Sequence, residues 1–300
     1  MPRGARLGAA SLGVAALGAG VFWLASAPDR LPPADLPPHH ADLANGRVLF
    51  FAGSCLYCHR PADPRADREL PSGGAAFATP LGTFYPQNLT PDPQTGLGRW
   101  SAADFLNAMT RGVSPRGRHY FPAFPYASFR FMRTEDLLDL YAYLMSLRPV
   151  RSPERPATVP LLPLARRGVG LWKRLAFRQV PPAAQPTRSA AWQRGAYLVT
   201  APGHCGECHT PRNLLMIPIA SRALAGGAHP AGEGRVPGLR GLLARHRYRD
   251  AADLASALEF GETYGYDKIS SGGMGQIQSN LARLPESDLQ AIAEYLVSLQ

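Results

Sequence analysis

Two copies of the pattern Cys-x-x-Cys-His constrain this chain of 300 residues more than any other feature. The first copy occupies residues 55–59 and the second occupies residues 205–209. Two thiols at this spacing can bond to one edge of a porphyrin, and the histidine that follows can supply an axial nitrogen to the iron. We therefore predict two covalently bound haem c groups. The residues that would hold them are Cys55, Cys58 and His59 in the first motif, and Cys205, Cys208 and His209 in the second.

Other interpretations of the motifs fit less well. The chain has four cysteines and the motifs use all of them, so none remains for a disulfide, a nucleophile or a thiolate ligand. A structural zinc ion takes four ligands, whereas each cluster offers three and the two clusters lie 150 positions apart. A redox-active dithiol does not need the histidine that follows each pair.

The N-terminus predicts a membrane segment. Two arginines precede an apolar run over residues 7–27, and about 20 apolar residues can cross a bilayer. We expect residues 1–28 to form an uncleaved signal-anchor transmembrane helix, followed by a proline-rich tether over residues 29–40. A cleaved signal peptide is the alternative, although Pro28 would hinder cleavage. Both interpretations place the rest of the chain in the periplasm, and the first anchors it in the bacterial inner membrane.

An internal repeat relates the two halves of the remaining chain. A glycine in an apolar stretch precedes each motif, at Gly46 and at Gly195. Each half later has an apolar segment that begins at an aspartate and ends in glycine, over residues 104–112 and 253–261. Capping residues at Ser101 and Asp250 predict helices for these segments. Since no stretch combines sustained alternation of apolar and polar residues with β-branched side chains, we expect no substantial sheet.

The repeat predicts two compact domains, at residues 41–149 and 191–300, joined by a linker over residues 150–190. The linker is rich in proline and carries eight arginines and lysines against Glu154 alone. It contributes most of the formal net charge of +10. A docking surface for an acidic partner or for anionic lipid is one interpretation. A linker packed across both domains is the other.

The sixth position of each iron is a separate question, because a methionine or histidine there favours electron transfer and an open position permits small-molecule chemistry. Met274, flanked by glycines ahead of the last helix, is the candidate in the second half. In the first half the repeat points to Phe124, which cannot ligate iron. Met132, a few residues further on, is the candidate there, with His119 as the alternative ligand and an open site as the third possibility.

Several segments resemble the membrane-anchored dihaem cytochromes c that serve periplasmic dehydrogenases. The chain is similar in the same way to the larger cytochrome c subunits of membrane-bound alcohol and gluconate dehydrogenases. The resemblance implies a mostly α fold with two tandem class I-type cytochrome c domains after an N-terminal transmembrane helix. In some members a methionine takes the place of Phe124, and others have phenylalanine there and a methionine at the Met132 position. The segments that carry the resemblance are residues 79–85, 88–101, 121–126 and 195–213.

The resemblance implies electron relay rather than catalysis. A periplasmic dehydrogenase of molybdopterin, flavin or quinoprotein type would reduce one haem, and the electron would leave to a downstream cytochrome or terminal oxidase. A dihaem enzyme of peroxidase type, with an open haem in the first domain, is the main alternative. Phe124 leaves this alternative possible, because the repeat points to its position and phenylalanine cannot ligate iron. A haem-based sensor is a third, although no signalling domain is recognised. Nucleic acid is not an expected partner.

Overall fold

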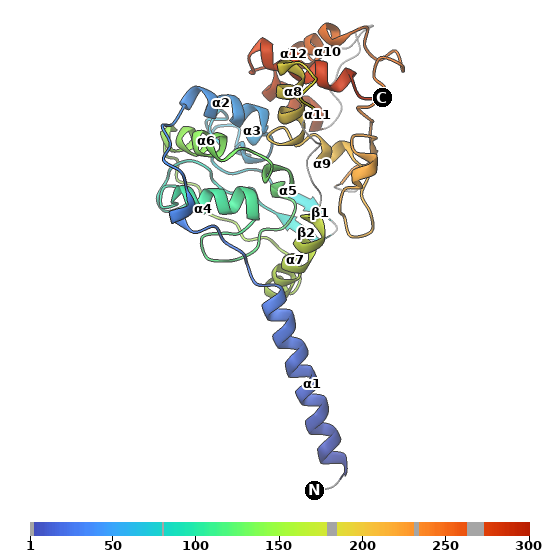
Figure 1. Ribbon diagram of the computed structural model, residues 1–300. Coiled ribbons are helices and arrows are strands. Elements are labelled where there is room, and N and C mark those ends of the chain that lie inside the picture. Colours follow the sequence, from blue (N-terminus) through green and yellow to red (C-terminus); the bar gives the residue numbers. More distant parts are fainter. Residues whose placement is uncertain (1–2, 80, 179–184, 231–233, 263–272) are drawn as a thin grey trace.

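The computed structural model describes residues 3–79, 81–178, 185–230, 234–262 and 273–300, and it is mostly helical (Figure 1). Helices of the first half are α1 (Arg3–Ala25), α2 (Leu43–Ala52), α3 (Cys55–His59), α4 (Ala102–Leu106), α5 (Tyr126–Phe129) and α6 (Thr134–Ser146). Those that follow are α7 (Leu162–Ala176), α8 (Ala190–Thr200), α9 (Gly206–His209), α10 (Ala251–Phe260), α11 (Gly273–Leu281) and α12 (Glu286–Val297). Short helical turns are η1 (Pro33–Asp35), η2 (Asn107–Arg111) and η3 (Ala220–Arg222).

The same helix crossing organises both halves. Helix α2 packs against α6 in the first half, and α8 packs against α12 in the second. A glycine lies at each crossing, where a Cβ on Gly46 would lie 2.2 Å from the carbonyl oxygen of Asp139. A Cβ on Gly195 would lie 1.8 Å from the carbonyl oxygen of Ala291. The glycines that mark the repeat in the sequence are therefore the residues that let the paired helices approach closely.

The capped helices form where the sequence predicts them. The Ser101 side chain accepts a hydrogen bond from the Asp104 N–H at 3.1 Å, and the Asp104 carboxylate accepts one from the Ser101 N–H at 3.1 Å. The Asp250 side chain caps α10 in a similar way. Helix α4 continues as the π-helical turn η2, and the left-handed Gly112 ends it with φ of 57°.

Strands are confined to two short antiparallel hairpins in the described part of the chain, which agrees with the prediction of no substantial sheet. In the first hairpin, β1 (Phe77–Thr79) pairs with β2 (Gly82–Phe84). In the second, β3 (Gly227–Ala228) pairs with β4 (Arg235–Val236).

Helix α1 requires a correction to the sequence analysis. Among the residues described, no helix combines the length and the apolar character that a bilayer crossing needs. The predicted transmembrane helix at residues 1–28 is contradicted by this finding. The same holds for the predicted location in the inner membrane through an N-terminal anchor.

Helix α7 shows that much of the segment between the halves is packed rather than solvated. Lys173 is buried and its Nζ donates hydrogen bonds to the carbonyl oxygens of Arg111 and Gly112, at 2.5 and 2.6 Å. On another side of the helix, the Trp172 indole N–H donates to the carbonyl oxygen of Leu215 at 2.7 Å. Helix α7 therefore contacts both halves, and Figure 1 shows it beside the C-terminal end of α1.

Candidate haem sites

Both Cys-x-x-Cys-His motifs form short helical turns that begin from an unusual backbone conformation. The first motif is helix α3, and the second begins at Cys205 and continues as α9. The residue before the first cysteine lies in the left-handed region in both copies, with φ of 47° at Ser54 and 40° at His204. None of the four cysteines forms a disulfide. The shared turn directs the chain from the preceding helix, α2 or α8, into the motif.

The two motif histidines are held in the same way. His59 donates its Nδ1 hydrogen to the carbonyl oxygen of Gln87 at 2.6 Å, and His209 donates its Nδ1 hydrogen to the carbonyl oxygen of Pro237 at 2.7 Å. Each acceptor lies 28 residues after its histidine. This hydrogen bond fixes the tautomer and leaves the Nε2 lone pair available, which is the arrangement of a metal-bound imidazole.

Burial disfavours the charged forms of these side chains. It lowers the pKa of His59 to about 4. It raises the pKa of Cys55 and of Cys205 to about 12. Nowhere in the described chain do three His, Cys, Asp or Glu side chains converge so that they could hold a metal ion by themselves. The residues present therefore fit covalent haem c.

The candidate sixth ligands occupy different settings. Met132 is buried in the core just before α6, and Met274 is half-buried in the first turn of α11. Residues 270–272, which precede Met274, lie outside the described residues. Phe124 stands in an aromatic cluster, with its ring centroid 5.8 Å from that of Phe129. The axial roles of the two methionines stay predictions.

His119, the alternative ligand in the first half, has both ring nitrogens engaged. Its Nδ1 accepts a hydrogen bond from Lys173 Nζ at 3.0 Å, and its Nε2 donates one to the carbonyl oxygen of Ser26 at 2.9 Å. A Cβ on Gly170 of α7 would lie 2.8 Å from Nε2 of His119. His119 therefore joins α7 and the end of α1 to the first half, and neither nitrogen is free to bind iron.

The two motifs lie close to one another. Burial raises the pKa of Cys58 to about 11, and the nearby Cys208 thiol adds to the effect. The pKa of Tyr57 is raised by burial and then by both of these cysteines. A Cβ on Gly273, beside Met274, would lie 2.6 Å from the Tyr57 hydroxyl. Tyr57 therefore lies at the junction of the two motifs and the start of α11.

A polar bridge ties the second motif to the first half. Glu207, inside the motif, accepts a hydrogen bond from the Ser128 hydroxyl at 2.6 Å. Its other carboxylate oxygen accepts one from Arg212 Nη2 at 2.5 Å. His204 Nε2 lies 3.2 Å from the carbonyl oxygen of Gly53, just ahead of the first motif. Sequence reasoning missed the two contacts between the halves, because Ser128 and Glu207 lie 79 positions apart and Gly53 and His204 lie 151 positions apart.

The chain matches one protein family and several named proteins. Residues 43–148 match the family described as Cytochrome c. A protein named "Diheme cytochrome c-type" from Cereibacter sphaeroides is 37% identical over 282 residues, which cover 93% of each chain. One of the subunits of nicotinate dehydrogenase from Pseudomonas putida is 42% identical over 282 residues. "Gluconate 2-dehydrogenase cytochrome c subunit" from Pantoea cypripedii is 36% identical over 284 residues.

The coverage differs among these relatives. The chain spans 23% of the nicotinate dehydrogenase subunit and 61% of the gluconate dehydrogenase subunit. It spans nearly the full length of the Cereibacter protein. The matches confirm the resemblance that the sequence segments indicate, and with it the two covalent haem c groups.

Proposed function

The chain belongs to the dihaem c-type cytochromes, and from that premise we propose that it carries electrons from a periplasmic dehydrogenase to a downstream cytochrome or oxidase. The observation that carries the proposal is the pair of motif histidines, each with its Nδ1 hydrogen on a carbonyl 28 residues away. The proximity of Cys58 to Cys208 supports it, because electron relay needs the two centres to be close.

The chain's own residues would hold and orient two haem groups. The four motif cysteines anchor the porphyrin edges, and His59 and His209 present Nε2 to the iron. Bound haem supplies a one-electron iron couple. The carbonyl oxygens of Gln87 and Pro237 hold each imidazole in one orientation and increase its electron donation.

Met132 and Met274 would complete the two sites as thioether ligands. Burial of Met132 in the core of the first half supports a closed site there. With both positions filled, neither iron would be open to peroxide or another small molecule. We propose on this basis that the protein transfers electrons and converts no substrate at its haems.

The dehydrogenase partner is proposed from the relatives, whose names describe subunits of nicotinate, gluconate and fructose dehydrogenases. The surface proposed for it is the turn after the second motif. Leu214 is fully exposed and Leu215 is 54% exposed, although Asn213 Oδ1 accepts from the Leu215 N–H and holds the turn firmly. A rigid turn that presents leucines to water is typical of a protein contact surface.

Carbon monoxide tests the relay against the dihaem enzyme. It binds ferrous haem only where the sixth position is open or weakly held. We expect the visible spectrum of the reduced holoprotein to show no shift of either haem on addition of the gas. A stoichiometric shift of one haem would contradict the closed-site proposal and would make peroxide turnover the next measurement.

A further inference from the structure

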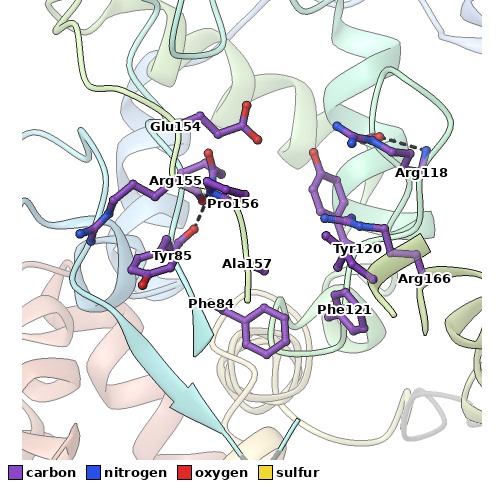
Figure 2. Close-up of a pocket in the computed structure, with 13 residues that line it drawn as sticks. Phe84, Tyr85, Arg118, Tyr120, Phe121, Glu154, Arg155, Pro156, Ala157 and Arg166 are labelled. Carbon is purple, nitrogen blue, oxygen red and sulfur yellow. Dashed lines mark hydrogen bonds between the residues drawn. The ribbon is translucent and has the colours of Figure 1, made fainter. Parts of the chain in front are cut away.

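The first half contains a cavity of about 180 Å³ that the electron-relay proposal does not use. It lies between hairpin β1–β2, the loop before α5, residues 154–157 and the start of α7. Figure 2 shows Tyr85, Glu154 and Arg155 on one side of it, with Arg118, Tyr120 and Arg166 facing them.

The charge around this cavity is unbalanced. Three arginines line it, and Glu154 is the only acidic residue among its lining residues. None of the ion pairs of the described chain joins Glu154 to an arginine. Arg155 is stacked 4.2 Å from the centroid of the Tyr85 ring. The cavity therefore carries an excess of positive charge that a bound anion would neutralise.

Arg166 gives a second reason to expect a bound anion in this cavity. Its Nη1 donates a hydrogen bond to the carbonyl oxygen of His119 at 2.8 Å, which fixes the guanidinium. Its Nε is buried and has no hydrogen-bond partner. Burial, and then the charge of Arg118, lower the pKa of Arg166. An unpaired buried donor is unfavourable, so this guanidinium has hydrogen-bonding capacity that the described chain does not satisfy.

Part of the wall is apolar, and the cavity adjoins the first motif. The Phe84 and Phe121 rings lie 5.2 Å apart between their centroids, and Leu162 lies beside them. Gln87 also lines the cavity, and its carbonyl oxygen is the one that accepts from His59 Nδ1. The anion should therefore have a flat apolar body, and it would bind directly behind the first haem motif.

We propose that this cavity binds a carboxylate carried on a small or flat apolar body. The planar guanidinium groups of Arg118 and Arg166 match a carboxylate, which can accept paired hydrogen bonds. Two sources have this chemistry: a propionate arm of the first haem, and a small free aromatic carboxylic acid. The first source rests on the proposed function, whereas the second does not.

The experiment uses the holoprotein with Arg118→Gln, Arg166→Gln and the double variant. Arg116→Gln is the control, because Arg116 is exposed, lies in the same loop and does not line the cavity. Spectroelectrochemistry measures the midpoint potential of each haem, and thermal unfolding is measured with and without benzoate as the free carboxylate. Arg166→Lys, which keeps the charge, shows whether loss of charge or loss of folding causes a change.

A haem propionate in the cavity predicts a lower potential for one haem in both cavity variants, because removing a nearby cation disfavours the reduced form. The control should match the unmodified protein, and benzoate should have no effect. A free carboxylate predicts that benzoate raises the unfolding temperature of the unmodified protein and not that of Arg166→Gln, with both potentials unchanged. Cavity variants that match Arg116→Gln in both measurements would overturn the proposal.

These measurements do not involve the redox partner. If the protein passed no electrons to or from a dehydrogenase, the potentials and the benzoate effect would still decide whether the cavity binds a carboxylate. If no haem attached at the first motif, the benzoate measurement alone would decide it.

Discussion

At the scale of single residues, both halves place a histidine against a carbonyl oxygen and a cysteine pair in a helical turn. The first half differs in the residues that are available as the sixth ligand of the iron. Phe124 is packed among aromatic rings, and His119 has no free nitrogen. Met132 is then the remaining candidate ligand among the three residues that the sequence singles out in this half, and its role can be tested directly.

Replacing Met132 with alanine should open one haem to carbon monoxide. The reduced variant is expected to bind about one equivalent of the gas, as seen in its visible spectrum, whereas the unmodified protein should bind none. Met109→Ala is the matched control, because Met109 is equally buried in the same half and is not a proposed ligand. Both variants lose a buried thioether and should each lose about 2–5 kcal/mol of stability. A Met132→Ala protein that binds no more gas than Met109→Ala would rule out this ligand.

Lys173 should make stability depend on pH. Burial disfavours its charged form and lowers the pKa from 10.5 to about 7. Between these values the unfolded chain binds a proton that the folded chain has released, so the free energy of unfolding should increase as pH rises from about 7 to about 10. Lys173→Met should abolish this increase in urea unfolding, and Arg178→Met, at an exposed position, should retain it. If the free energy of unfolding depended on pH equally in the two variants, Lys173 would not be the titrating group.

At the scale of helices, Gly46 and Gly195 set how closely the paired helices cross. Gly195→Ala should lower the free energy of unfolding by about 1–3 kcal/mol, because the new methyl group would overlap the Ala291 carbonyl. Gly168→Ala on α7 is the control. It meets nothing within 4 Å, and it should raise stability by up to about 1 kcal/mol through helix propensity. Urea unfolding of the holoprotein measures both, and destabilisation by both variants would mean that close packing at the crossing is not the cause.

The helices also show how far local sequence reasoning extends. Ser101 and Asp250 cap helices as predicted, because a cap depends on residues three positions away. The π-helical turn η2 and the packing of Lys173 were not predictable, because both depend on contacts with segments far along the chain. The anchor prediction failed for another reason. It rested on the apolar run over residues 7–27, and no helix among the described residues combines the length and the apolar character that a bilayer crossing needs.

At the scale of the whole molecule, two haem groups and a relay function follow from the motifs and the resemblance. The contact between the halves does not follow from the motifs or from the resemblance. Ser128, Glu207 and Arg212 form one continuous bridge from the first half through the second motif to the exposed turn. Arg212 Nη1 donates to the carbonyl oxygen of Met216 at 2.7 Å, so the turn is fixed to the motif itself. A partner bound at this turn would lie beside the second haem site.

The turn should therefore control the rate of electron entry or exit without changing the haems. The double variant Leu214→Glu, Leu215→Glu replaces two exposed leucines with carboxylates, and losing about 1.4 kcal/mol of contact energy would slow reaction with the redox partner about tenfold. Stopped-flow absorbance with the purified dehydrogenase measures this rate. Leu81→Glu is the control, since Leu81 is 59% exposed but lies in hairpin β1–β2 of the first half. Both variants should keep the potentials of the unmodified protein, because the substituted side chains are exposed to water. If the double variant reacts as fast as Leu81→Glu, the partner binds elsewhere, and the exposed leucines need another explanation.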